Sequence, residues 1–166
     1  MTTTSQVPAI TDYLVAAAAA WPALAGVTVF DGPQVPVATT GIERVLWIGA
    51  DPAQLPNPTA DAVQAWPVLD FARTKDEDGT ITCAAQHWSG DTTVKAHRDG
   101  AAAIVAGMEL LLRGNPAQGG PGDASMGGLA LWSGVDALTW YQRQVANGAL
   151  CLVTFTIVYK ARLVTS

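Results

Sequence analysis

The closing stretch Ala149-Leu-Cys-Leu-Val-Thr-Phe-Thr-Ile-Val-Tyr-Lys-Ala-Arg-Leu163 predicts a long β-strand, because β-branched and aromatic residues dominate it. Cys151, Phe155 and Tyr159 point to one face, whereas Leu150 and Val158 point to the other. A strand that carries apolar residues on both faces lies inside a sheet rather than at its margin. We therefore expect this strand in the interior of the sheet.

A second stretch, Thr93 to Arg113, predicts the main helix. Its apolar residues recur at spacings of three and four, as in a helix that buries one face. That face comprises Val94, His97, Ala101, Ile104, Val105, Met108, Leu111 and Leu112. A neighbouring face has almost no side-chain bulk and comprises Ala96, Gly100, Ala103 and Gly107. Because a glycine inside a helix costs about 1 kcal/mol relative to alanine, we expect this face to approach the sheet or another subunit closely.

The remaining segments are shorter. An alanine-rich helix is predicted from Pro8 or Thr11 to about Ala20, where Trp21-Pro22 ends it. Strands are predicted over 26–30 and 43–49, and two short strands over 129–132 and 138–144, separated by a turn.

A β-hairpin is predicted where the segments 63–74 and 80–88 flank the polar sequence Lys75-Asp-Glu-Asp-Gly79. A run of charges that ends in glycine is typical of a solvated turn. Asp76, Glu77 and Asp78 are therefore predicted at the tip of the hairpin.

The order of these segments predicts a single α+β domain over 1–166. We expect a mostly antiparallel sheet, with an N-terminal helix and one long central helix packed on it. The sequence contains no internal repeat and no linker that divides it. Glycine and proline are concentrated in 114–128, which predicts a flexible loop.

Composition favours assembly over chemistry. Only 14% of the residues are charged and 49% are hydrophobic, whereas soluble domains carry roughly 25% charged residues. Other subunits could cover part of so apolar a surface. The net charge of −5 argues against nucleic-acid binding, and no apolar run reaches the ~18 residues of a membrane span.

No catalytic, metal-binding or cofactor-binding motif is recognisable. Cys83, His87 and Asp91 are spaced four apart, which in a strand separates neighbours by about 13 Å, too far to share a metal ion. Cys83 and Cys151 are interpreted as small core residues rather than a disulfide. The sequence predicts no enzyme, although a pocket around His87 and the tryptophans, in a ligand-binding domain or an unrecognised enzyme, stays as an alternative.

Six tryptophans are many for 166 residues. About half are interpreted as core residues and the others as interface anchors, where tryptophan is over-represented. The predicted subunit interface combines the small-residue helix face with Trp47, Trp66 and Trp88.

Several motifs occur in a familiar order. Val27-Thr-Val-Phe-Asp-Gly-Pro33 precedes Arg44-Val-Leu-Trp-Ile-Gly-Ala-Asp-Pro52. His87-Trp-Ser-Gly-Asp91 opens a helix that ends in Glu109-Leu-Leu-Leu-Arg-Gly114, and the last strand contains Phe155-Thr-Ile-Val-Tyr-Lys-Ala-Arg162. Over most of its length the chain thus resembles the tail terminator (tail-completion) proteins of long-tailed bacteriophages.

The resemblance implies a hexameric ring that caps the tail tube and joins it to the head connector. The implied partners are further copies of the chain, the major tail (tube) protein and the head–tail connector protein. The implied location is the tail of the virion, with assembly in the host cytoplasm. DNA would pass through the ring without specific binding, and the turn at 76–78 would face the lumen and repel phosphates. A head–tail connector or adaptor protein is the alternative within this class.

Overall fold

The computed structural model describes residues 4–33, 41–52, 58–66, 74–114, 122–146 and 148–164. The helical elements are α1 (Val7–Ala20), the 3-10 turn η1 (Pro22–Leu24) and α2 (Val94–Leu111). The strands are β1 (Thr28–Asp31), β2 (Arg44–Ile48), β3 (Ala60–Ala65), β4 (Thr74–Ser89), β5 (Trp132–Val145) and β6 (Gly148–Val164). The α+β fold with a mostly antiparallel sheet is confirmed.

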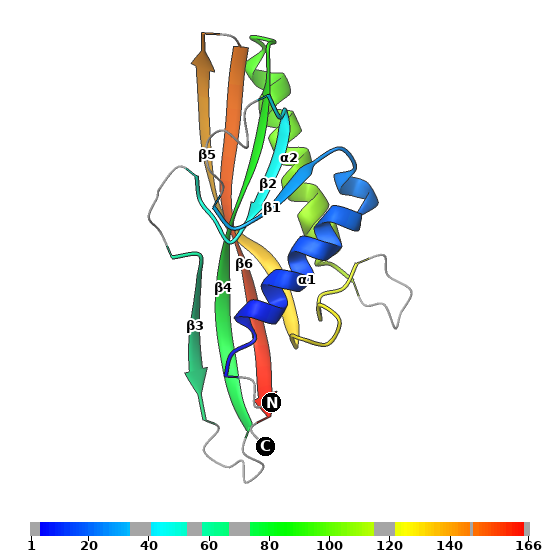
Figure 1. Ribbon diagram of the computed structural model, residues 1–166, viewed down its shortest axis with the longest axis vertical. Coiled ribbons are helices and arrows are strands. Elements are labelled where there is room, and N and C mark those ends of the chain that lie inside the picture. Colours follow the sequence, from blue (N-terminus) through cyan, green and yellow to red (C-terminus); the bar gives the residue numbers. More distant parts are fainter. Residues whose placement is uncertain are drawn as a thin grey trace.

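The strands form one sheet in the order β1-β2-β4-β6-β5, and β3 pairs with β4 beyond the end of β2. β1 and β2 are parallel, and the other neighbours are antiparallel. The long strands β4, β5 and β6 run along the length of the molecule, and both termini lie near its lower end (Figure 1). As predicted, β6 lies inside the sheet, paired along its length with β4 on one side and with β5 on the other.

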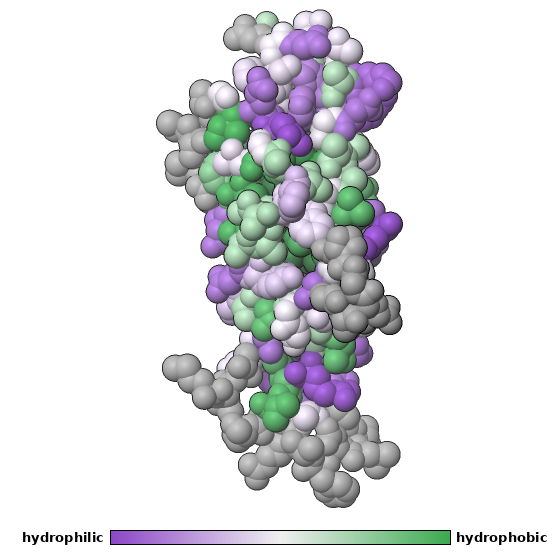
Figure 2. Space-filling model, turned by 90° about the vertical axis from the view of Figure 1, so that its right-hand side faces the viewer, coloured by the Kyte–Doolittle hydropathy of each residue, from purple (hydrophilic) through white to green (hydrophobic). Residues whose placement is uncertain are grey.

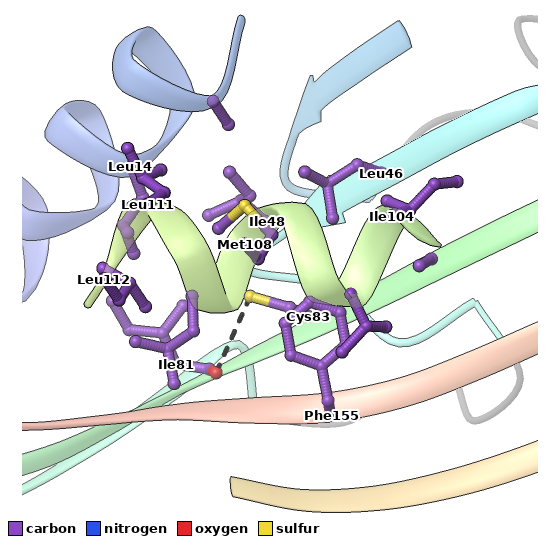
Figure 3. Packing of buried hydrophobic residues seen from close by; sticks show 14 of the residues in the cluster. Leu14, Leu46, Ile48, Ile81, Cys83, Ile104, Met108, Leu111, Leu112 and Phe155 are labelled. Carbon is purple, nitrogen blue, oxygen red and sulfur yellow. Dashed lines mark hydrogen bonds between the residues drawn. The ribbon is translucent and has the colours of Figure 1, made fainter. Parts of the chain in front are cut away.

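Both helices cover the same face of this sheet (Figure 1). The buried face of α2 meets the side chains of β2, β4 and β6 that point toward it (Figure 3). Met108 and Ile104 lie above Cys83 and Phe155, all with 1% exposure or less. α1 adds Ile10, Leu14 and Ala18. The two predicted helices are thus confirmed, and their apolar periodicity marks the faces that they bury.

The predicted turn at 75–79 is wrong. These residues belong to β4, and Asp76, Glu77 and Asp78 pair with Ala65, Gln64 and Val63 of β3. A hairpin does form between β3 and β4, but the chain reverses after Ala65 rather than at the acidic run.

The two short strands predicted over 129–132 and 138–144 are also wrong in part. β5 is one strand from Trp132 to Val145, interrupted only by an irregularity between Asp136 and Thr139, where Ala137 has a φ of 46°. The expected turn at Ser133-Gly134 is extended, because both residues pair with β6.

The loop predicted over 114–128 lies partly outside the described residues, at 115–121. In its second half Asp123 accepts hydrogen bonds from the backbone N–H groups of Ser125 and Gly127. Met126 is completely buried in the core. This half of the segment is therefore held on the domain by a buried side chain and local hydrogen bonds.

Candidate assembly surface

Among the residues that the structure describes, no helix lies on the face of the sheet opposite α1 and α2, which we call the helix-free face. Register places Val45, Gln86, Leu152 and Tyr141 in one row across β2, β4, β6 and β5 on this helix-free face. A second buried cluster lies here and contains Val45, Trp47, Ala50, Ala84 and Leu152. The opposite, helix-bearing side is shown in Figure 2, where hydrophilic residues gather near the upper end and apolar or weakly polar ones dominate the middle.

A groove of about 640 Å³ lies on the helix-free face. Its floor is formed by Leu150 and Leu152, and polar side chains reach it from β4 and β5. Its lining residues are Pro52, Gln86, Trp140, Tyr141, Gln142, Arg143, Leu150 and Leu152. The guanidinium of Arg143 lies beside the aromatic and aliphatic side chains of this groove. Such a surface could accept an acidic or apolar segment of another protein chain.

β5 forms one margin of the sheet and is unusually exposed. Ser133 is buried and Gly134 and Val135 are half-buried, but every residue from Asp136 to Gln144 is exposed. Among the described residues β5 pairs only with β6, so its outer backbone edge has no partner strand there. A long apolar edge of this kind is a template for pairing with another chain.

β3 forms part of the opposite margin and is exposed from Asp61 to Ala65. Within the described chain it pairs only with β4, through six residue pairs. Val63 is 73% exposed, and Trp66, directly after the strand, is 63% exposed.

The two margins together present a substantial apolar surface. The large exposed side chains there are Val63, Trp66, Leu131, Trp132, Leu138, Trp140 and Tyr141. At their fractional exposures they present on the order of 700 Å², if a whole aromatic side chain has roughly 150–250 Å². A standard protein interface takes about 800 Å² from each partner. In a contact between one margin and the other, these side chains would supply somewhat less than half of the roughly 1,600 Å² that such an interface buries in total.

The acidic run lies in strand β4 rather than at the tip of a turn. The Glu77 side chain is completely buried and points to the helix side. Its carboxylate accepts hydrogen bonds from Gln6 N and Tyr159 Oη at 2.9 Å each and from Gln64 Nε2 at 2.5 Å. Burial opposes ionisation, but these bonds and one from Ser5 outweigh it and lower the pKa of Glu77.

Asp76 and Asp78 lie on the helix-free face, each beside a cation. Arg162 donates to Asp76 through Nε at 2.7 Å and through Nη2 at 3.0 Å, and Lys160 lies 3.4 Å from Asp78. The hydrogen bond from Arg162 lowers the pKa of the Asp76 carboxyl. The negative charge of this run is thus largely balanced within the domain.

The small-residue face of α2 is used largely within the domain. A Cβ on Gly107 would lie 2.6 Å from Leu24 Cδ2, and one on Gly100 would lie 2.4 Å from His87 Cδ2. Both glycines therefore permit close intramolecular approach, one of the two explanations expected. Ala96 and Ala103 are exposed.

The three tryptophans predicted at the interface have different surroundings. Trp47 is 4% exposed and packs in the cluster on the helix-free face. Trp88 is half-buried, and Trp66 is exposed. Of these three tryptophans, only Trp66 and the exposed part of the Trp88 side chain are accessible to another subunit.

His87 does not lie in the groove. Its ring is on the helix side, where Nδ1 lies 3.0 Å from Nδ1 of buried His97, and His97 Nε2 lies 2.8 Å from the Asp91 carbonyl. Because a carbonyl only accepts, His97 Nε2 donates a hydrogen bond to it, and the Nδ1 atoms of the two rings share a second hydrogen bond. Burial, with smaller contributions from His97 and Arg44, lowers the pKa of His87.

The described residues contain no group of three His, Cys, Asp or Glu side chains placed to hold a metal ion. Neither described helix combines the length and apolar character needed to cross a membrane. Both cysteines are free and buried, in agreement with their interpretation as core residues.

The sequence reasoning missed the importance of β5. Trp132 and Trp140 were assigned to strands, but the continuous exposed edge that joins them to Leu138 and Tyr141 was divided by a predicted turn. The signal was the run Leu138-Thr-Trp-Tyr141, which places large apolar or aromatic side chains on both faces of the strand.

No family model matches the chain, and no curated protein matches it.

Proposed function

We propose that this protein is a structural component of a phage tail, a tail terminator that forms a ring on the end of the tail tube. The observation that carries the proposal is a pair of margins, β3 on one side of the sheet and β5 on the other, that have no further partner strand within the described part of the chain. A contact between two different margins can repeat from copy to copy and closes into a ring when the rotation permits. The class of ring and its expected number of copies, six, are what the resemblance of the quoted motifs to tail terminator proteins implies.

The low charge of the chain and its exposed aromatic margins support a role in assembly. In this role further copies of the chain would cover the margins, and one end of the ring would contact the major tail (tube) protein. The other end would present the surface for the head–tail connector protein. With Glu77 buried and Asp76 and Asp78 paired, repulsion of DNA from a lumen would have to come from other acidic groups.

The test is the mass of the purified protein, measured by light scattering after gel filtration at several concentrations. We expect a hexamer, or a monomer that forms hexameric rings when tail tubes are added. Electron microscopy of these mixtures should show rings on one end of each tube, and capped tubes should no longer take up tube protein.

A protein that stays monomeric and ignores tail tubes would overturn the proposal. Rings that bind DNA-filled heads but not tubes would favour the head–tail connector instead.

A further inference from the structure

We propose that the sheet continues from copy to copy, because β5 of one copy pairs along its free edge with β3 of the next. This inference rests on the proposed ring, and it names the two strands that build it. Its occupant is a second copy of this chain, in an antiparallel β-ladder.

The exposure of its residues indicates which part of β5 pairs with the neighbouring copy. The irregularity between Asp136 and Thr139 divides the strand. The first part is partly covered, since Ser133 is buried and Gly134 is half-buried. Residues 139–144 are all exposed, and this segment matches the six residues of β3 in length.

Two of the devices that protect natural edge strands from pairing are absent from both segments. Residues 139–145 and 60–65 contain no lysine and no proline, the residues that usually prevent an edge from pairing. Within the domain, residues 61–65 of β3 are exposed and β4 is its only partner among the described strands, although Gln64 is also hydrogen-bonded to Glu77 and Thr4. A short strand of this kind gains stability from a second partner.

Direction and charge specify the register. β3 is antiparallel to β4, β4 to β6, and β6 to β5, so β3 and β5 run in opposite directions across the sheet. If neighbouring copies in a ring have similar orientations, β5 of one copy therefore runs antiparallel to β3 of the next. Each segment carries a single charge, Asp61 in β3 and Arg143 in β5.

Both charges lie on the helix-free face, since Asp61 pairs with Thr80 and Arg143 with Leu150. Placing Asp61 opposite Arg143 of the neighbouring copy joins opposite charges. In this antiparallel register Ala65 lies opposite Thr139. An isologous β5–β5 contact would instead stop at a dimer and leave β3 open.

Disulfide trapping tests the pairing. Ala65→Cys and Thr139→Cys place thiols at two exposed positions on the same face, and native Cys83 and Cys151 are completely buried. Within one chain β3 and β5 are three strand spacings apart, about 14 Å, whereas a disulfide needs Cα atoms within about 7 Å. Any disulfide between these positions therefore joins two copies.

We expect covalent dimers when Ala65→Cys protein is mixed with Thr139→Cys protein and oxidised, and a ladder of multimers from the double variant. Gly134→Cys is the matched control, because its Cβ meets no atom within 4 Å and it lies about 17 Å along β5 from Thr139. It should not link to Ala65→Cys. Dimers from Thr139→Cys alone would show β5–β5 pairing and overturn the inference.

A charge exchange gives a second measurement that needs no oxidation. Asp61→Arg and Arg143→Asp should each weaken self-association several-fold in sedimentation, and the two changes combined should restore it. If the combined variant is folded by circular dichroism but does not regain self-association, the proposed pairing is overturned as well.

The two proposals fail in different ways. Wild-type rings that cap tail tubes but give no β3–β5 disulfide would overturn the pairing and leave the proposed function standing. Disulfide-linked rings that do not bind tail tubes would leave the pairing and overturn the tail-terminator assignment.

Discussion

Tyr159 Oη donates a hydrogen bond of 2.9 Å to the Glu77 carboxylate, and both side chains are buried under the N-terminus of α1. The same carboxylate oxygen accepts the backbone N–H of Gln6, the residue that precedes α1. The other oxygen accepts from Gln64 Nε2, and Gln64 also donates to the Thr4 carbonyl at 2.7 Å. Glu77 thus fixes the start of a helix from a strand 71 residues away.

Removal of this carboxylate should destabilise the domain. Glu77→Ala leaves the Gln6 N–H and the Tyr159 hydroxyl without their acceptor in a buried place, which costs about 2–3 kcal/mol. Urea unfolding, followed by circular dichroism, measures the loss. The matched control is Asp78→Ala, one residue along β4, whose side chain is 60% exposed and whose loss should change the free energy of unfolding by no more than about 0.5 kcal/mol. Equal effects of the two changes would contradict the anchoring role.

Gly79 should tolerate no side chain, because the ring of Tyr159 lies against it. A Cβ on Gly79 would be 2.4 Å from Cζ and Oη of Tyr159, and the ring cannot move without breaking its bond to Glu77. Gly79→Ala should therefore destabilise the protein by about 2–4 kcal/mol, measured by urea unfolding. In a double-mutant cycle, combination with Tyr159→Leu should cost less than the sum of the two single changes. If the two losses of stability simply add, a clash with the Tyr159 ring does not cause the effect of Gly79→Ala.

These contacts explain which part of the fold could be predicted. The periodicity of α2 and the two apolar faces of β6 are local properties of the sequence, and both elements were predicted closely. The run of acids before Gly79 also gave a local signal, that of a turn, but distant partners override it. Glu77 is held by Gln6 and Tyr159, and Gly79 is needed for the ring of Tyr159.

The candidate site was less predictable for the same reason. Two glycines in α2 indicated a close approach, but no local pattern could show that His87 and Leu24 are the side chains that approach. The exposed margin of β5 depends on strand order, which places β6 inside and β5 outside. Apolar residues on both faces occur in both strands, and only pairing distinguishes them.

The two cysteines should be unreactive in the folded protein. Burial raises the pKa of the Cys83 thiol to about 12 and also raises the pKa of Cys151, and the thiolate is the reactive form. We expect a maleimide reagent at pH 7.5 to label neither cysteine in native protein and both in denaturant, as counted by mass spectrometry. The exposed Thr139→Cys variant is the positive control and should gain one label while folded. Rapid labelling of the wild type would show that the core opens.

The burial of His87 beside His97 makes the stability of the protein depend on pH. Because burial lowers the pKa of His87 below its unfolded value of about 6.5, the unfolded chain binds the proton more tightly. The stability from neutral His87 is therefore complete above pH 6.5 and is lost as pH falls from there toward the lower folded pKa.

Urea unfolding at pH 7.5 and 5.5 tests this dependence. His87→Gln keeps a donor for His97 Nδ1 but removes the titration, so the difference between the two pH values should be smaller in the variant than in the wild type. The hydrogen-bonded carboxylates Glu77 and Asp91, whose pKa values are lowered, affect stability mainly below this range. The same pH dependence in variant and wild type would assign the effect to another group.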